Sequence, residues 1–312
     1  SLLLQLLLKC YLRTLQKESK MKKKLLFILM LIIGSFSFAE NIVITSIQPL
    51  YSLTSYLTKG TDIKVYTPFG SDISMTMSKE AIREEGFNLA VAKKAQAVVD
   101  IARIWSEDVI YGKARMNKIN IVEIDASHPY DEKMTTLFFS DYSNGKVNPY
   151  IWTGSKNLVR MINIIARDLI RLYPQNKAKI EKNITKFTAD LLKIENEANE
   201  KLLAVGEAEV ISLSENLQYF LNDMNIYTEY VDYDSVNAQN IAKLIKDKGI
   251  KVIVSDRWLK KDAIKTLKEA GGEFVIINTL DIPMDKDGKM DPEAILKAFK
   301  ENTDNLIEAL KK

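Results

Sequence analysis

The sequence of 312 residues predicts an α/β fold: two parallel-sheet α/β lobes connected by one long rigid helix. Two observations favour this fold class. Strand-like and helical segments alternate before residue 155 and again after residue 206, as in parallel sheets with crossover helices. Between these two regions, apolar residues recur at helical spacing without a break.

The first region contains four strand-like runs, at residues 42–45, 63–69, 97–102 and 118–125. After the first run, Pro49 is followed by Leu50, Leu53 and Leu57 at helical spacing, and a second helical stretch covers 78–95. Strands that alternate with helices in this way predict one α/β lobe.

The middle of the chain is helical. The stretch 155–173 begins at Ser155, which suits an N-cap, and Pro174 suits the first turn of the next helix. Apolar residues then follow at alternating spacings of four and three until Gly206: Ile180, Ile184, Phe187, Leu191, Ile194, Ala198 and Leu202. About 30 residues at 1.5 Å each span on the order of 45 Å, more than one small lobe. We therefore predict a single helix that links two lobes, since an isolated coiled coil would be longer.

The alternation then resumes and predicts the second lobe. Its strands are expected at 208–214, 226–232, 250–256 and 273–280, and its helices at 215–225, 237–249, 260–271 and 291–312.

The segment from Met21 reads as a secretory signal. Three lysines precede the apolar run 25–33, and Ser37 and Ala39 satisfy the small-residue rule for cleavage before Glu40. The apolar run is too short to cross a bilayer, which takes roughly 20 residues. The predicted divisions are a signal peptide at 21–39, lobes at 40–172 and 206–312, and the connecting helix at 173–205.

We interpret residues 1–20 as a non-native upstream extension rather than a membrane-facing amphipathic segment. Cys10, the only cysteine, lies there, so a chain from Glu40 would have no disulfide and no lipid-attachment cysteine. We expect this mature chain to be soluble in the periplasm. Residues 1–39 hold seven of the 44 basic and one of the 41 acidic residues, so their removal changes the net charge from +3 to −3. Nothing indicates a nucleic-acid partner.

Four stretches carry a family resemblance. They are "IQPLYSLTSYLTKGTDIKVYTPFGSDI" (47–73), "NPYIWTGSKN" (148–157), "SLSENLQYFLNDMNI" (212–226) and "VIINTLDIP" (275–283). In content and order they resemble the zinc/manganese substrate-binding proteins of bacterial ABC transporters. The resemblance covers essentially the whole mature chain. It implies a binding protein that holds a ligand between two lobes and delivers it to an ABC permease and ATPase in the inner membrane.

The metal-ligand positions implied by the resemblance are mostly substituted. The two loop histidine positions read Ser74 and Tyr150, the third position reads Ser214 or Glu215 depending on the register, and only Asp281 matches. Hydroxyl groups are weak ligands for zinc at neutral pH. This set of residues suits an oxygen-preferring cation, so the transported ligand would be a divalent metal ion. The alternative is that the cleft has been rebuilt for another small ligand.

Other residues have weaker claims to a role. His128 is interpreted as a surface loop residue rather than a metal contact, and 284–293 as a polar turn rather than a calcium loop, because the loop register fails. Asp256, Arg257 and Trp258 follow a strand end and are candidates for the cleft, although Asp256 could instead cap a helix. Trp105 and Trp152 are further candidates for the cleft. The alternative is a place in the hydrophobic core, which is commoner for tryptophan.

An enzyme is not predicted, because the chain has no nucleophile elbow, no glycine-rich phosphate loop and only one histidine. The leading hypothesis is a periplasmic solute-binding protein of an ABC importer in the metal-ion family, acting as a monomer. The alternatives are a binding protein for an organic ligand or a metal chelate, and an envelope adhesin or scaffold that retains the fold. The long helix predicts modest lobe closure on binding.

Overall fold

A computed structural model describes residues 40–68, 75–77, 80, 89–131, 133–280 and 291–312. The chain divides into two units, Ser1–Glu40 and Asn41–Lys312, and every described helix and strand belongs to the second. The predicted extension at 1–20 and signal peptide at 21–39 lie outside the described residues. Within the described parts of the chain, no helix has both the length and the hydropathy that a membrane crossing requires.

The N-terminal lobe is built on a four-stranded parallel sheet with the order β2-β1-β3-β4. The strands are β1 (Asn41–Thr45), β2 (Ile63–Tyr66), β3 (Ala97–Asp100) and β4 (Val122–Asp125). β3 is buried along its whole length, as expected for a central strand covered by helices on both faces. The register pairs Asp100 with Asp125 at the carboxyl ends of β3 and β4.

Three helices with described bounds accompany this sheet. Helix α2 (Gln48–Leu57) has Pro49 in its first turn, and α4 (Leu89–Lys94) is the described part of the helix expected at 78–95. Helix α5 (Ile110–Asn117) is absent from the prediction. It buries only Ile110 and Ala114, so its apolar stripe is too narrow to show clearly in the sequence.

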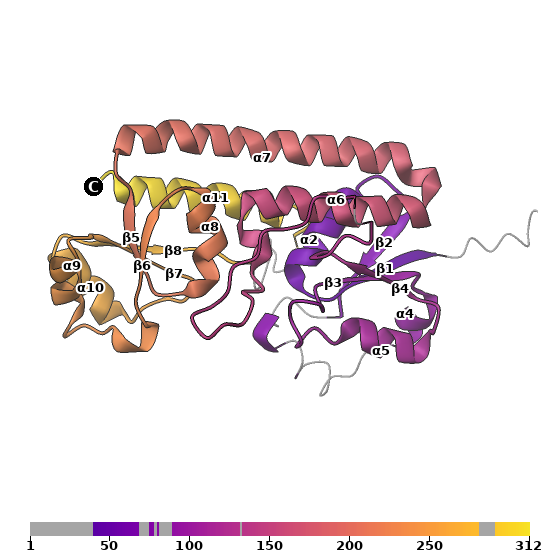
Figure 1. Ribbon diagram of the computed structural model, residues 1–312, viewed down its shortest axis with the longest axis horizontal. Helices are drawn as coiled ribbons and strands as arrows, with labels where there is room; N and C mark the ends of the chain where they lie inside the picture. The colour runs from indigo at the N-terminus through magenta and orange to yellow at the C-terminus, as the bar shows by residue number, and fades with distance from the viewer. Residues whose placement is uncertain (1–39, 69–74, 78–79, 81–88, 132, 281–290) are drawn as a thin grey trace, which may run out of the picture. The chain divides into compact units, whose positions relative to one another are not determined.

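The linking region consists of α6 (Ser155–Leu172), a short 3-10 turn and α7 (Lys177–Val205). Helix α7 has 29 residues, or on the order of 44 Å, and runs beside α6 and α11 (Figure 1). Gly206 ends it with a φ of 86°, which glycine adopts without strain. Ser155 is the first residue of α6 rather than its cap. The N-cap is Gly154, where a Cβ atom would lie 2.8 Å from the Asp223 carboxylate.

The C-terminal lobe repeats the topology of the first. Its sheet has the order β6-β5-β7-β8, with β5 (Glu209–Ser212), β6 (Tyr227–Tyr230), β7 (Val252–Ser255) and β8 (Glu273–Ile276). The helices are α8 (Gln218–Asp223), α9 (Ile241–Lys248), α10 (Lys261–Glu269) and α11 (Ala294–Leu310). The strand order therefore matches that of the N-terminal sheet, although the two halves show no repeat in sequence.

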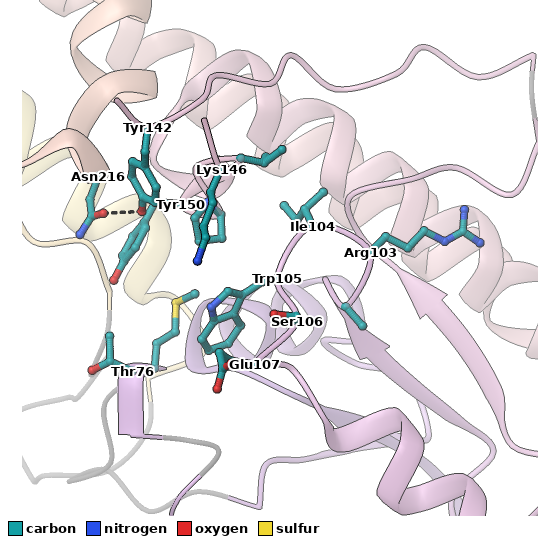
Figure 2. Close-up of a pocket in the computed structure, with 14 residues that line it drawn as sticks. Thr76, Arg103, Ile104, Trp105, Ser106, Glu107, Tyr142, Lys146, Tyr150 and Asn216 are labelled. Carbon is teal, nitrogen blue, oxygen red and sulfur yellow. Dashed lines mark hydrogen bonds between the residues drawn. The ribbon is translucent and has the colours of Figure 1, made fainter. Parts of the chain in front are cut away.

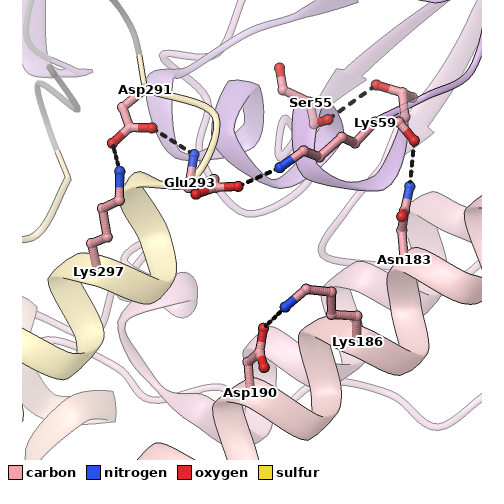
Figure 3. A network of polar contacts seen from close by, with 9 residues as sticks. Ser55, Lys59, Asn183, Lys186, Asp190, Asp291, Glu293 and Lys297 are labelled. Atoms are coloured by element: carbon pink, nitrogen blue, oxygen red, sulfur yellow. Dashed lines mark hydrogen bonds and ion pairs between the residues drawn. The ribbon is translucent and has the colours of Figure 1, made fainter.

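One continuous apolar core joins both lobes to the long helix. Phe187, in the middle of α7, is fully buried and meets Tyr56 of α2 edge to face, with ring centroids 5.2 Å apart. Polar contacts add to this packing (Figure 3). Asn183 of α7 donates hydrogen bonds to the Leu57 and Lys59 carbonyls, and Lys59 pairs with Glu293, just before α11, at 2.5 Å. The end of α2 is thus held by both the long helix and the C-terminal lobe.

Candidate functional site

A cavity of about 630 Å³ opens where loops after β3 and β5 approach each other. These loops lie at the carboxyl ends of parallel strands, where α/β folds commonly bind ligands. Figure 2 shows the side chains that line it. They come from residues 75–76, 102–107, 142–150 and 216, and include Trp105, Glu107, Tyr142, Lys146, Tyr150 and Asn216.

The loop 101–108, which supplies Trp105 and Glu107, is held by a buried carboxylate. Asp108 accepts hydrogen bonds from the Ser46 hydroxyl at 2.5 Å and from the Ile101 amide at 3.1 Å. Within the loop, the Trp105 amide donates to the Ile101 carbonyl at 3.1 Å. Because both ends of the loop are bonded in this way, the position of Trp105 at the cavity wall follows from the sheet itself.

A second buried carboxylate supports the same loop from β4. Asp125 accepts a hydrogen bond from the Arg103 amide at 3.1 Å and from the Ser127 amide at 2.8 Å. The Arg103 Nε lies 3.8 Å from Asp125, and Figure 2 shows the guanidinium directed away from the cavity. Arg103 therefore contributes its backbone to the lining more than its charge.

Asp100, at the end of β3, completes this acidic group. Its side chain is fully buried, and its oxygens have no hydrogen-bond partner among the described residues. Burial, followed by the charges of Asp108 and Asp125, raises the pKa of Asp100 to about 9. Burial also raises the pKa of Asp108 to about 6, although the Ser46 hydrogen bond opposes the shift. At neutral pH Asp100 is therefore a neutral acid at the end of β3.

The loop 140–150 forms the facing wall. A bridge between Asp141 and Val147 closes it on itself, and Tyr219 of α8 anchors it from the other lobe. The Tyr219 hydroxyl accepts from the Ser140 amide and donates to the Asn148 carbonyl, each at 2.9 Å. These contacts fix the loop that presents Tyr142 and Lys146.

The candidate metal ligands are distributed unevenly. Tyr150 is buried and lines the cavity. Ser214 and Glu215 are outside the lining. Ser214 accepts from the Asn216 amide at 3.3 Å and donates to Asp256 at 2.9 Å, while the Glu215 carboxylate accepts from the Ser143 amide at 3.1 Å. The remaining two candidates, Ser74 and Asp281, lie outside the described residues.

The three residues after β7 are also outside the lining. Asp256 accepts hydrogen bonds from Ser214 and, at 2.7 Å, from the Asn216 amide group, and it caps no helix, because α10 starts at Lys261. The Arg257 guanidinium lies 3.9 Å from the centre of the Tyr233 ring. Trp258 is 67 % exposed beside Phe274.

Other residues singled out in the sequence have structural contacts. Trp152 is buried, and its indole bonds to the Thr279 carbonyl. His128 stacks on Phe139 and lies 2.8 Å from the Ser127 hydroxyl, away from the cavity. Of the segment 284–293, residues 284–290 lie outside the described part of the chain.

Metal-ligating side chains are not clustered in the described parts of the chain. No cluster of three or more histidine, cysteine, aspartate or glutamate side chains there could hold an ion. Glu107 is the one carboxylate among the described lining residues, and none of them is a histidine.

Several lining residues were missed in the sequence. Tyr142, Lys146 and Asn216 belong to the cavity, and Tyr142 donates a hydrogen bond to Asn216 at 2.6 Å. Asn216 stands two residues after Ser214, so the strand-end rule that selected Ser214 could have selected it too. Tyr142 and Lys146 carry no local signal, because their placement depends on Tyr219.

Comparison with known proteins agrees with this architecture. A family model described as "Zinc-uptake complex component A periplasmic" (ZnuA) matches residues 43–309. The metal ABC transporter substrate-binding lipoprotein SsaB of Streptococcus sanguinis is 25 % identical over 182 residues, which are 57 % of this chain and 54 % of that protein. The iron ABC transporter substrate-binding lipoprotein MtsA of Streptococcus pyogenes serotype M1 is 26 % identical over 182 residues, which are again 57 % of this chain and 54 % of that protein.

A solved structure extends the likeness to the fold of both lobes. An FpvC mutant from Pseudomonas aeruginosa superimposes with a TM-score of 0.67 at 17 % identity, covering 87 % of this chain and 99 % of the other. The matches to SsaB and MtsA span about half the length of each relative. The family model covers most of the chain, so the resemblance inferred from the four stretches is confirmed, and this protein belongs to the ZnuA family.

Proposed function

We propose that this protein is the substrate-binding component of an ABC importer in the metal-ion class, and that it delivers its cargo to a permease and an ATPase. The observation that carries the proposal is the cavity at the carboxyl ends of two parallel sheets in a chain of this family. Relatives named as metal and iron ABC transporter substrate-binding lipoproteins support it. We place the protein outside the cytoplasmic membrane, as a periplasmic monomer released by cleavage before Glu40.

The transported species could be a bare cation or a larger molecule that carries it. A bare oxygen-preferring cation would be gripped by Ser74, Tyr150, Asp281 and either Ser214 or Glu215. Ser214 and Glu215 already bond within the protein, to Asp256 and to the Ser143 amide. Neither of them is among the described residues that line the cavity. We therefore propose that the transported species enters the cleft attached to, or in the form of, a larger molecule.

Deletion of the gene in its own host tests the importer role. The deletion strain should hold less zinc, manganese or iron than the parent in metal-limited medium, measured by mass spectrometry of whole cells. The complete gene should restore the content, and a copy lacking residues 21–39 should not, because its product would stay in the cytoplasm. Equal metal content in parent and deletion strain would refute the proposal.

A further inference from the structure

The size of the cavity admits a small organic molecule as well as a bare ion. Oxygen ligands surround a bare cation at about 2.5 Å, so a coordination sphere fills roughly 65 Å³. The cavity measures about 630 Å³, nearly ten times more. It falls within the range of roughly 300–1,000 Å³ that small organic ligands occupy.

The walls of the cavity offer flat apolar surface. Trp105, Tyr142 and Tyr150 contribute aromatic rings from two separate loops. Trp105 and Tyr142 are half-buried, so part of each ring is open to a ligand. Aromatic side chains of this kind bind planar molecules by stacking and by burial of apolar area.

Among the described lining residues, the charges do not favour a bare divalent cation, because the Lys146 ammonium accompanies the Glu107 carboxylate. In Figure 2 the Lys146 ammonium faces the Trp105 indole across the cavity, and Glu107 lies on the far side of that ring. Lys146 has no ion pair or side-chain hydrogen bond with any described residue. Lys146 is exposed, so its ammonium group repels a bare cation and attracts an anion with the moderate strength of a charge in contact with water.

Taken together, the volume, the rings and Lys146 lead us to propose that the cleft binds an anionic organic molecule with a flat unsaturated part, either free or as a metal chelate. The flat part stacks on Trp105 and Tyr142, and the anionic group contacts Lys146. Asn216, which accepts a hydrogen bond from Tyr142, belongs to the C-terminal lobe and lines the same cavity. This inference rests on the proposed importer role, because it names the cargo of that cleft.

Calorimetric titration of the purified protein tests the charge and the ring separately. The probes are 2,3-dihydroxybenzoate, its neutral amide, the ferric complex of the acid, and Mn²⁺ or Zn²⁺ alone. We expect Lys146→Gln to weaken binding of the acid about tenfold, the loss of about 1.4 kcal/mol, and to leave the amide nearly unchanged. Trp105→Leu should weaken both. Tighter binding of the ferric complex than of the free acid identifies a chelate as cargo. The reverse identifies a metal-free cargo, which would overturn the metal-ion class of the proposed importer but not the anion site itself.

Matched controls come from the same protein. Lys113→Gln removes an exposed lysine on α5, and Trp258→Leu removes an exposed tryptophan outside the cavity lining. Both should bind the acid as the parent does. The inference is overturned if neither the acid nor its ferric complex binds below 1 mM, or if both bind Lys146→Gln as they bind the parent. Failure of the importer role is distinguishable, because the intact gene would then not restore cellular metal content.

Discussion

The Trp152 indole donates a hydrogen bond to the Thr279 carbonyl at 2.7 Å, across 127 positions of sequence. Trp152 is 1 % exposed and belongs to the segment before α6, while Thr279 follows β8 of the other lobe. If this buried hydrogen bond is broken, the Thr279 carbonyl has no water molecule to bond in its place. This hydrogen bond therefore holds the two lobes together next to Tyr150, which lines the cavity.

Trp152→Phe should lower the free energy of unfolding by about 1–3 kcal/mol, because it leaves the Thr279 carbonyl unpaired and removes part of a buried ring. Urea denaturation followed by circular dichroism measures the change. Trp258→Phe is the matched control, since that side chain is 67 % exposed, and it should change stability by less than about 0.5 kcal/mol. Equal effects of the two substitutions would show that the bond to Thr279 contributes nothing.

The long helix offers a second matched pair. Phe187→Ala should destabilise the protein by about 3–5 kcal/mol, because the ring is fully buried against Tyr56 and leaves a cavity when removed. Leu192, on the same helix, is 53 % exposed, and Leu192→Ala should cost less than about 0.5 kcal/mol. Thermal unfolding of both variants measures the difference. If Phe187→Ala unfolds at the parental temperature, α7 is not packed as described.

The buried acid predicts the pH dependence of stability. The pKa of Asp100 is about 9 in the folded protein, and the reference value is about 3.9. Between these values the folded state holds a proton that the unfolded state has lost, so the free energy of unfolding falls as pH rises. The slope reaches at most about 1.4 kcal/mol per pH unit for one proton. Asp108, with a pKa of about 6, adds to the fall only at lower pH.

Asp100→Asn isolates this effect. The amide cannot ionise, so between pH 6 and pH 9 the unfolding temperature of the variant should decline less than that of the parent, and at pH 8 it should be the higher of the two. Differential scanning calorimetry at several pH values gives the comparison. Asp234→Asn, at an exposed site, should follow the parent. Parallel curves for Asp100→Asn and the parent would mean that Asp100 is ionised in the folded state.

The fold could be predicted because its main features are periodic in the sequence. All eight predicted strands overlap observed ones, and the apolar stripe from Ile180 to Leu202 corresponds to α7. Helix α5 was missed because it buries only two residues. The N-cap assigned to Ser155 was wrong because Gly154 takes that place, where the approach of Asp223 leaves no room for a Cβ atom.

The site was predicted less completely, because it depends on contacts between distant residues. Tyr150 and Trp105 were identified as candidates and line the cavity. Lys146 could not be, since its loop is held by Tyr219, more than 70 residues away. The grouping of Asp100, Asp108 and Asp125 follows from the pairing of β3 with β4, which no local pattern in the sequence reveals.

The last prediction concerns motion between the lobes. Helix α7 packs on elements of both lobes, and three polar contacts add to it: Trp152 with Thr279, Lys59 with Glu293, and Tyr219 with the loop 140–150. A hinge needs a few residues free to change their backbone angles, and these contacts oppose that change. X-ray scattering profiles recorded with and without saturating 2,3-dihydroxybenzoate or its ferric complex should therefore superimpose. The double variant Trp152→Phe, Tyr219→Phe loses two of the contacts and should show the larger change on ligand addition. A large change in the parent protein would mean that the lobes close in spite of these contacts.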